Sequence, residues 1–87
     1  MQDHQRMSDM MRDLIQYIMI PRIRYDAGIG TYASYDIAAY DCLTATLAEI
    51  VWDVTPDREL ALRMVERFNR YRLEPCHLLD AVCDMLD

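Results

Sequence analysis

The 87-residue sequence contains no lysine, only two glycines and no long uninterrupted apolar run. The longest apolar stretch, Leu14 to Ile20, is broken by Gln16 and is far shorter than the ~20 residues that a membrane-spanning helix needs. Gly28 and Gly30 lack the third glycine, the lysine and the directly following helix of a phosphate-binding loop. These absences argue against a membrane protein and against a nucleotide-binding enzyme, and they predict no cofactor.

The sequence contains three cysteines, Cys42, Cys76 and Cys83. Three is an odd number, and no two of them form a CxxC pair. If Cys76 and Cys83 share a helix, about 10.5 Å of helical rise separates them, which is too far for a disulfide. We therefore expect three free thiols and a reducing compartment. The acidic residues before the apolar stretch have the wrong charge for a signal peptide, so we expect a cytoplasmic protein.

The charge balance is acidic, with nine arginines against fifteen Asp and Glu and a formal net charge of −6. A negative surface repels the phosphate backbone, and no basic tail offsets it, so nucleic acid is disfavoured as a partner. The charge is uneven, because residues 58–72 hold five Arg and two Glu. This local excess of +3 leaves −9 for the remainder of the chain.

Length and apolar content bound the organisation of the chain. Eighty-seven residues have room for one hydrophobic core, and an apolar fraction of 53% is enough to fill it. A domain of this size buries only about 60–65% of its unfolded surface, so we expect a thin margin of stability. We expect a single domain over residues 14–87 and an N-terminal extension over residues 1–13 that is flexible or forms a short helix.

Alternation of apolar and polar residues in the first half of the chain predicts β-strands. The first is expected over about residues 16–25 and the second over residues 31–41. Two closely spaced glycines between them predict the turn of a hairpin. Pro21 places the first strand at a sheet edge or a bulge. A helix is the alternative for residues 7–20, and the sequence leaves that choice open.

A third strand is expected over residues 47–54, followed by two helices. Thr55 is predicted to cap the first helix, with Pro56 at its first position and its end near Arg72. Pro75 is predicted to open the last helix. The order predicts an α+β fold: a three-stranded antiparallel sheet with two C-terminal helices packed on one face. Inward-facing positions are expected at Ala48, Ile50, Trp52 and Val54 of the strand, at Ala61, Met64, Val65, Phe68 and Tyr71 of the first helix, and at Leu78, Leu79, Val82, Met85 and Leu86 of the second.

Four parts of the chain carry a family resemblance: Tyr35-Asp36-Ile37, Trp52-Asp53-Val54-Thr55, Asn69 and the closing segment Leu73-Glu74-Pro75-Cys76-His77-Leu78-Leu79-Asp80-Ala81-Val82-Cys83-Asp84-Met85-Leu86. Through them the chain resembles, over roughly residues 15–87, a family of short uncharacterised bacterial proteins, mainly from Firmicutes, known only as a domain of unknown function. The closing helix is the specific part, and the family usually has glycine where this chain has Asp36. The resemblance implies a short sheet plus two helices. It implies no functional site, because the family has no established activity.

The last predicted helix holds residue types that metal sites and thiol enzymes use. His77, Asp80 and Asp84 stand at i, i+3 and i+7, but one His and two short acids on one helix rarely converge on a metal ion. Cys76 and His77 are neighbours that point about 100° apart, which disfavours a catalytic pair. We therefore predict no metal site and no catalytic residue. Whether Cys76, in the first turn of the helix, is redox-active stays open.

Arg63, Arg67 and Arg70 stand at i, i+4 and i+7 and form one basic line, which we call the Arg ridge. It is either a docking face for an acidic partner or nucleic acid, or an ordinary set of surface ion pairs. Glu59 and Glu66 are correctly spaced for i, i+4 pairs with Arg63 and Arg70. We favour the ion pairs, because such pairs are common on helices.

Tyrosines concentrate in the predicted strands, and Tyr35 and Tyr40 fall on opposite faces of the second one. Two short helices cover only one face of a three-stranded sheet, so some aromatic surface is expected to remain open. Such surface is more often an interface than a ligand pocket in a small domain. The alternative is that the rings lie flat on the sheet with their hydroxyls in water.

These observations favour a non-enzymatic interaction or regulatory module that binds a protein partner or itself as a homodimer. A nucleic-acid-associated accessory factor using the Arg ridge is the alternative. A small enzyme or metal-binding protein comes third, because so short a chain has little room for a pocket of several hundred Å³. The predicted partner-binding residues are Arg63, Arg67, Arg70, Tyr35 and Tyr40.

Overall fold

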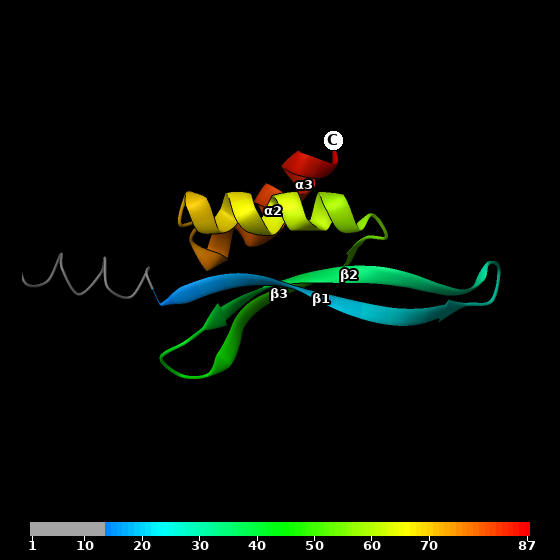
Figure 1. Ribbon diagram of the computed structural model, residues 1–87, viewed down its shortest axis with the longest axis horizontal. Coiled ribbons are helices and arrows are strands. Elements are labelled where there is room, and N and C mark those ends of the chain that lie inside the picture. Colours follow the sequence, from blue (N-terminus) through cyan, green and yellow to red (C-terminus); the bar gives the residue numbers. More distant parts are fainter. Residues whose placement is uncertain (1–13) are drawn as a thin grey trace, which may run out of the picture.

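The structure, a computed structural model, describes residues 14–87 and consists of a three-stranded antiparallel sheet with two helices on one face (Figure 1). The strands stand in the sheet in chain order, so the second is central. This arrangement confirms the predicted fold class. The extension predicted over residues 1–13 lies outside the described residues. The elements are β1 (Ile15–Asp26), β2 (Gly30–Asp41), β3 (Thr46–Thr55), α2 (Arg58–Arg70), the 3₁₀ turn η1 (Pro75–His77) and α3 (Leu78–Leu86).

The alternative of a helix is excluded for residues 15–20, because they belong to β1. Pro21 lies in this edge strand opposite Tyr35 of β2. The backbone N–H of Tyr17, four residues earlier, points away from β2 and donates to a helix side chain. Strand alternation gives Pro21 the same outward direction, so its missing N–H removes no bond to β2. The sequence prediction of an edge strand is confirmed.

The β1–β2 hairpin is longer than the rest of the sheet. Strand β2 pairs with β3 only between Tyr35 and Asp41, whereas from Gly30 to Ser34 it pairs with β1 alone. The two-stranded end therefore projects beyond both β3 and the beginning of α2 (Figure 1). We call this projecting part, residues 22–34, the arm. A two-stranded hairpin is marginally stable by itself, so the arm depends on how its base is held.

A bulge in β3 ends its pairing with β2. Ile37 pairs with Val51 and Tyr35 pairs with Thr55, so four steps along β3 match two along β2. Asp53, inside this bulge, has a φ of 53°, in the left-handed region that aspartate tolerates better than most residues. The bulge bends the chain away from the arm and toward α2.

The bulge also corrects the predicted facing of β3. The alternation predicts Ile50 and Trp52 on the core side, but Ile50 pairs opposite Ala38 on the open face and Trp52 is exposed. The core side is instead occupied by Val51 and Val54, which pack against the buried cluster. These two residues are three apart and share a face only because the extra residues break the strict alternation of a regular strand.

The start of α2 differs from the prediction by two residues. Asp57 is the cap, and its carboxylate accepts hydrogen bonds from the backbone N–H groups of Glu59, at 3.0 Å, and Leu60, at 3.3 Å. Thr55, the predicted cap, is the buried last residue of β3, and its hydroxyl accepts a bond from the Asp57 N–H at 3.0 Å. A carboxylate accepts hydrogen bonds from the backbone N–H groups of the first helical turn, and its negative charge also interacts favourably with the positive end of the helix dipole. A threonine hydroxyl is uncharged and provides less of this second effect.

The core forms between the sheet and one side of each helix. Most of the predicted inward positions of the helices are confirmed, but Tyr71, Leu79 and Leu86 are exposed. Tyr71 follows the end of α2, and Leu79 lies about 100° around α3 from the buried Leu78, where it lines an open cleft between α3 and β3. The buried cluster consists of Tyr17, Ile37, Ala39, Ala61, Met64, Phe68, Leu78 and Val82.

Tyr17 ties β1 to the helices. Its ring meets Phe68 edge to face, with centroids 5.7 Å apart, and its hydroxyl donates to the Leu73 carbonyl oxygen. Burial, reinforced by the nearby Cys76 and Glu74, raises the pKa of Tyr17 to about 12. The hydroxyl therefore remains protonated, and able to donate this bond, well above the pH at which a free tyrosine ionises.

Asn69 covers the outer edge of β1. Its side-chain oxygen accepts the Tyr17 N–H at 2.7 Å, and its side-chain amide donates to the Tyr17 carbonyl at 3.0 Å. The amide group thus takes the place of one residue of a neighbouring strand. An unpaired edge is a site for unwanted strand pairing, and Asn69 closes it where the helix crosses.

We expect Asn69→Ala to lower the free energy of unfolding by about 1–3 kcal/mol, because two partly buried backbone groups lose their partners together. Urea denaturation followed by circular dichroism measures this loss. Glu66→Ala, an exposed change on the same helix, is the control and should stay within about 0.5 kcal/mol. Equal stability of the two variants would show that water replaces the Asn69 bonds at no cost.

Candidate interaction surfaces

The arm presents apolar side chains to water. Ile23 is 75% exposed, Tyr25 is 76% exposed and Ile29, in the turn, is 73% exposed. Ile23 and Tyr25 lie on the same face of β1 as Tyr17, in the part of the hairpin that projects beyond the beginning of α2 (Figure 1). Three large apolar side chains on one short hairpin are unusual for a surface that contacts only solvent.

A buried carboxylate holds the base of the arm. Asp36 is fully buried on the sheet face opposite the helices. It accepts hydrogen bonds from Nε of Arg22, at 2.8 Å, from Nη2 of Arg24, and from the backbone N–H of Asp53, at 2.8 Å. Two arginines of the arm and the bulge of β3 therefore meet at one residue of the central strand.

The Asp53 side chain extends this network along the arm. Its carboxylate accepts hydrogen bonds from the Ser34 hydroxyl and, at 3.0 Å, from the Tyr32 hydroxyl. Ser34 is buried and Tyr32 is half-buried. Both belong to the stretch of β2 that has no β3 partner, so side-chain bonds replace the missing backbone ladder there.

The network shifts the ionisation of both carboxyls. Burial is the largest influence on Asp36 and by itself raises its pKa. The hydrogen bonds from the Asp53 N–H, Arg22 and Arg24 outweigh burial, so the pKa of Asp36 is lowered. Hydrogen bonds from Ser34 and then Tyr32 lower the pKa of Asp53. Both side chains are therefore held in their charged forms, which the arginines require.

The open face of the sheet carries the second apolar surface. Tyr40 lies there, half-buried, as predicted, together with Ile18 of β1 and Trp52 of β3. The guanidinium carbon of Arg22 lies 5.2 Å from the Trp52 ring centroid. Tyr35 lies on the helix side, half-buried against the core, so the structure does not bring the two predicted tyrosines together.

The Arg ridge lies exposed on α2, without the ion pairs that the sequence favoured. No carboxylate of residues 14–87 lies within 4.0 Å of the guanidinium groups of Arg63, Arg67 or Arg70. The expected pairs with Glu59 and Glu66 are therefore wrong. Correct i, i+4 spacing allows such a pair but does not require it, because both side chains lose conformational freedom when they join.

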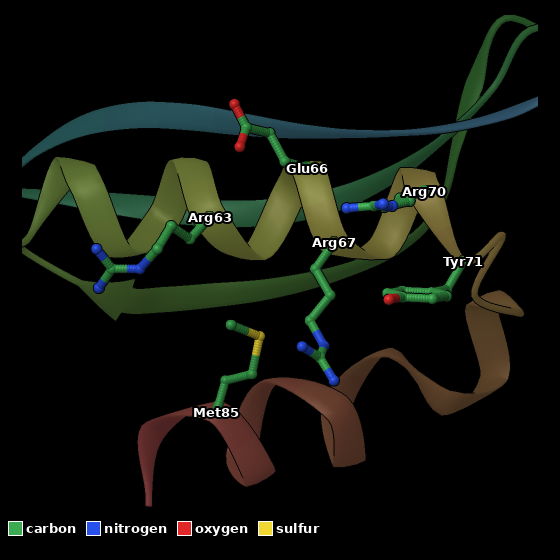
Figure 2. A pocket seen from close by; sticks show the side chains of 6 residues that line it. All are labelled: Arg63, Glu66, Arg67, Arg70, Tyr71 and Met85. Carbon is green, nitrogen blue, oxygen red and sulfur yellow. The ribbon is translucent and has the colours of Figure 1, made fainter.

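An open cleft of about 270 Å³ separates the ridge from α3 (Figure 2). The Arg67 side chain points across it toward α3, and Met85 points back from α3 toward α2 (Figure 2). The exposed ring of Tyr71 closes one end, with the guanidinium carbons of Arg67 and Arg70 at 5.5 and 5.9 Å from its centroid. Arginine against a tyrosine ring is a pairing often found where proteins bind one another.

A second open cleft, of about 480 Å³, lies between β3 and the segment from η1 to α3. It is larger than we expected a chain of this length to hold. Its walls carry no cluster of convergent polar groups of the kind that fixes a substrate. The lining residues are Glu49, Ile50, Val51, Trp52, Pro75, Cys76, Leu78 and Leu79.

The three cysteines are free, as predicted, and all are exposed. The structure does not gather His77, Asp80 and Asp84. Among the described residues, it places the donor atoms of Glu74, Cys76 and His77 within 4.8 Å of one another. These donors all come from one exposed turn, and no donor from a second element of the described residues joins the group, so they make a poor cage for a metal ion. That no metal is bound stays a prediction.

No family model, no curated protein and no solved structure matches this chain. Within residues 14–87, the helices are too short or too polar to cross a membrane. The arm, its Asp36 base and the Arg ridge with its cleft are therefore the features from which a function is inferred.

Proposed function

We propose that this chain is a non-enzymatic protein-interaction module that docks through its arm. The single observation behind this proposal is the exposure of Ile23, Tyr25 and Ile29 on a hairpin that projects from the body. Natural domains rarely expose several large apolar residues together without a partner to bury them.

The geometry of the arm suits a protein partner better than a small ligand. From Gly30 to Ser34 the outer edge of β2 carries no neighbouring strand, so its backbone groups can pair with an added strand. Ile23 and Tyr25 stand on β1, opposite Ala33 and Thr31 of β2, so a partner that adds a strand to β2 would cover them from the sheet face. Neither cleft described above reaches the arm.

The Asp36 network supports the same proposal, because docking needs a rigid element. A free hairpin would lose conformational entropy on binding, which lowers affinity. Arg22 and Arg24 fix the arm to Asp36 before any partner arrives. The arm is therefore pre-organised at its base and apolar near its tip.

Nucleic acid remains the alternative, and the unpaired Arg ridge is what favours it. The net charge of −6 opposes it. Exposed Asp80 and Asp84 on α3, the helix across the cleft, also oppose a polyanion at this place. We therefore keep the prediction that nucleic acid does not bind at physiological ionic strength.

The proposed function also includes self-association of the chain as a homodimer.

The test places a photoreactive amino acid at position 25 and, as a control, at position 44. Thr44 is also exposed but lies in the β2–β3 turn, away from the arm. We expect position 25 to give one discrete adduct in native lysate and position 44 to give none, because only the arm is buried by the partner. Mass spectrometry identifies the adduct.

A matched variant makes this test specific. Ile23→Ser with Ile29→Ser removes apolar surface that is already exposed, so stability should change by less than about 1 kcal/mol. The adduct from position 25 should fall at least tenfold. An adduct that persists in this variant, or equal labelling from both positions, contradicts docking through the arm.

A further inference from the structure

Two lines of opposite charge run along the two helices. The Arg ridge lies on α2, and Asp80, Asp84 and Asp87 form an exposed line on α3, which we call the acidic ridge. Asp87 follows the last residue of α3, but its N–H still bonds the Cys83 carbonyl at 3.2 Å, so the helical path continues to it. Both ridges have the spacing i, i+4, i+7, and each therefore extends about 10.5 Å along its helix.

Within one chain the ridges do not neutralise each other. None of the three aspartates lies within 4.0 Å of a cationic group of residues 14–87. The side chains that face each other across the cleft are instead Arg67 and Met85 (Figure 2). Each ridge is left without an opposite charge from residues 14–87, and each matches the other in length and spacing.

We propose that the Arg ridge of one copy binds the acidic ridge of a second copy in a two-fold symmetric dimer. Two-fold symmetry makes the contact twice, α2 of each copy against α3 of the other. This inference rests on the part of the proposed function in which the chain binds itself. It places the dimer contact on the two helices and leaves the arm free.

The chain itself supplies the reason for choosing a second copy over other acidic partners. Nucleic acid complements only the Arg ridge, and its phosphates are repelled by the negative charge of the exposed aspartates on α3. A second copy presents a complementary charge to both ridges at once, with equal spacing. Complementary charge fixes register and partner choice more than it adds affinity.

Apolar groups beside the ridges complete the contact, because exposed ion pairs alone are weak. Tyr71 is 67% exposed at the end of the Arg ridge. Leu79 is 59% exposed and Leu86 is 47% exposed on α3, next to the acidic ridge. Aromatic and arginine side chains at the centre of an interface with apolar neighbours are typical of contacts that hold protein dimers together.

Charge reversal on each ridge provides the test. One variant carries Arg63→Glu, Arg67→Glu and Arg70→Glu, and the other carries Asp80→Arg, Asp84→Arg and Asp87→Arg. In sedimentation velocity over a hundredfold dilution, we expect the wild type to shift from one-chain to two-chain mass in the micromolar range. Each variant alone should stay at one-chain mass, because both contacts become repulsive. An equimolar mixture of the two variants should restore the two-chain mass, because both contacts become attractive again.

Three outcomes would overturn the proposal. They are a wild type of one-chain mass at every concentration, variants that dimerise as the wild type does, and a mixture that stays at one-chain mass. Salt-sensitive binding of a DNA or RNA duplex by a one-chain wild type would likewise assign the Arg ridge to nucleic acid. Circular dichroism checks that the variants fold. If a triple variant does not fold, the single pair Arg67→Glu and Asp84→Arg, alone and mixed, gives the same comparison.

The arm experiment separates this proposal from the proposed function. If the arm docks a different protein, the adduct from position 25 persists in the variant with the reversed Arg ridge, whatever the dimer does. If the ridges form the dimer and the arm is idle, charge reversal abolishes the two-chain mass while position 25 gives no adduct. The two failures therefore have different signatures.

Discussion

Asp36→Ala is expected to lower the free energy of unfolding by about 3 kcal/mol, because it leaves two arginines and a backbone N–H without their shared partner. Breaking a buried ion pair by removing one side costs about 3–5 kcal/mol. The lower end applies here, since the Arg22 side chain is 42% exposed and that of Arg24 is 26% exposed, so water partly replaces the carboxylate. Urea denaturation measures the loss, and Glu49→Ala, an exposed carboxylate removed from the same sheet, is the control.

The pH dependence of stability gives a second check on Asp36. Its pKa is lowered in the folded protein, so its contribution is fully present above the unfolded value of about 3.9 and is lost as the pH falls through the folded pKa. The wild type should lose stability below about pH 4 more steeply than Asp36→Asn, which has no proton to bind there. Parallel acid unfolding curves for the two proteins would show that Asp36 makes no charged contribution.

Phe68→Ala is expected to cost about 3–5 kcal/mol, an effect at least as large as that of Asp36→Ala. Phe68 is 4% exposed and its ring meets Tyr17, which also carries the contacts to Leu73 and Asn69. A domain of this size has a total stability of only about 5–10 kcal/mol, so the variant should be partly unfolded at about 37 °C. Thermal unfolding by calorimetry or circular dichroism measures this.

A volume-conserving change in the same core is the control for Phe68. Met64 is fully buried, and Met64→Leu keeps nearly the same volume and apolar character. It should cost less than about 1.5 kcal/mol. A loss for Met64→Leu as large as that for Phe68→Ala would mean that the core tolerates no repacking, and that the Tyr17 contact is not what makes Phe68 special.

The sequence is sufficient for the order and approximate bounds of the strands and helices, because alternation, the paired glycines and Pro56 each act over a few neighbouring residues. The predicted first strand over residues 16–25 differs from β1 by one residue at each end. The edge position of Pro21 also follows from local chemistry, since a residue without an N–H has few places in a sheet. Short-range patterns therefore suffice to predict these elements from the amino acids alone.

The facing of β3 is not predictable in this way, because it depends on a bulge whose cause lies elsewhere. The Asp53 N–H, in a residue with positive φ, bonds the Asp36 side chain on the neighbouring strand. Strand alternation correctly places Asp36 on the face away from Ile37, and Arg22 and Arg24 on one face of β1. Their meeting requires the β1–β2 register, which the hairpin turn sets and which side-chain patterns alone leave undetermined.

Some features of the interaction surfaces are likewise predictable from the sequence and others are not. The Arg ridge follows from its helical spacing, but its lack of ion pairs with the carboxylates of residues 14–87 is a matter of side-chain conformation. The arm escapes sequence reasoning because Ile23 and Tyr25 continue the alternation of β1 without interruption. The one available signal is length: residues 47–54 make a shorter third strand than the hairpin needs for full cover. Comparing strand lengths across the predicted sheet would have indicated uncovered apolar residues.

Because of the bulge in β3, the arm can differ in length without a change in the packing of the rest of the domain. The bulge turns the chain toward α2 at Thr55, and the residues of β2 that precede Tyr35 do not belong to the core. The hairpin tip can therefore be lengthened or shortened without repacking the core. Two residues added to each strand keep every side chain on its original face of the hairpin. A single residue inserted in one strand moves every side chain beyond it to the opposite face. Homologous arms should therefore differ in reach by even numbers of residues per strand, in steps of about 7 Å. The same body would then serve partners at different distances.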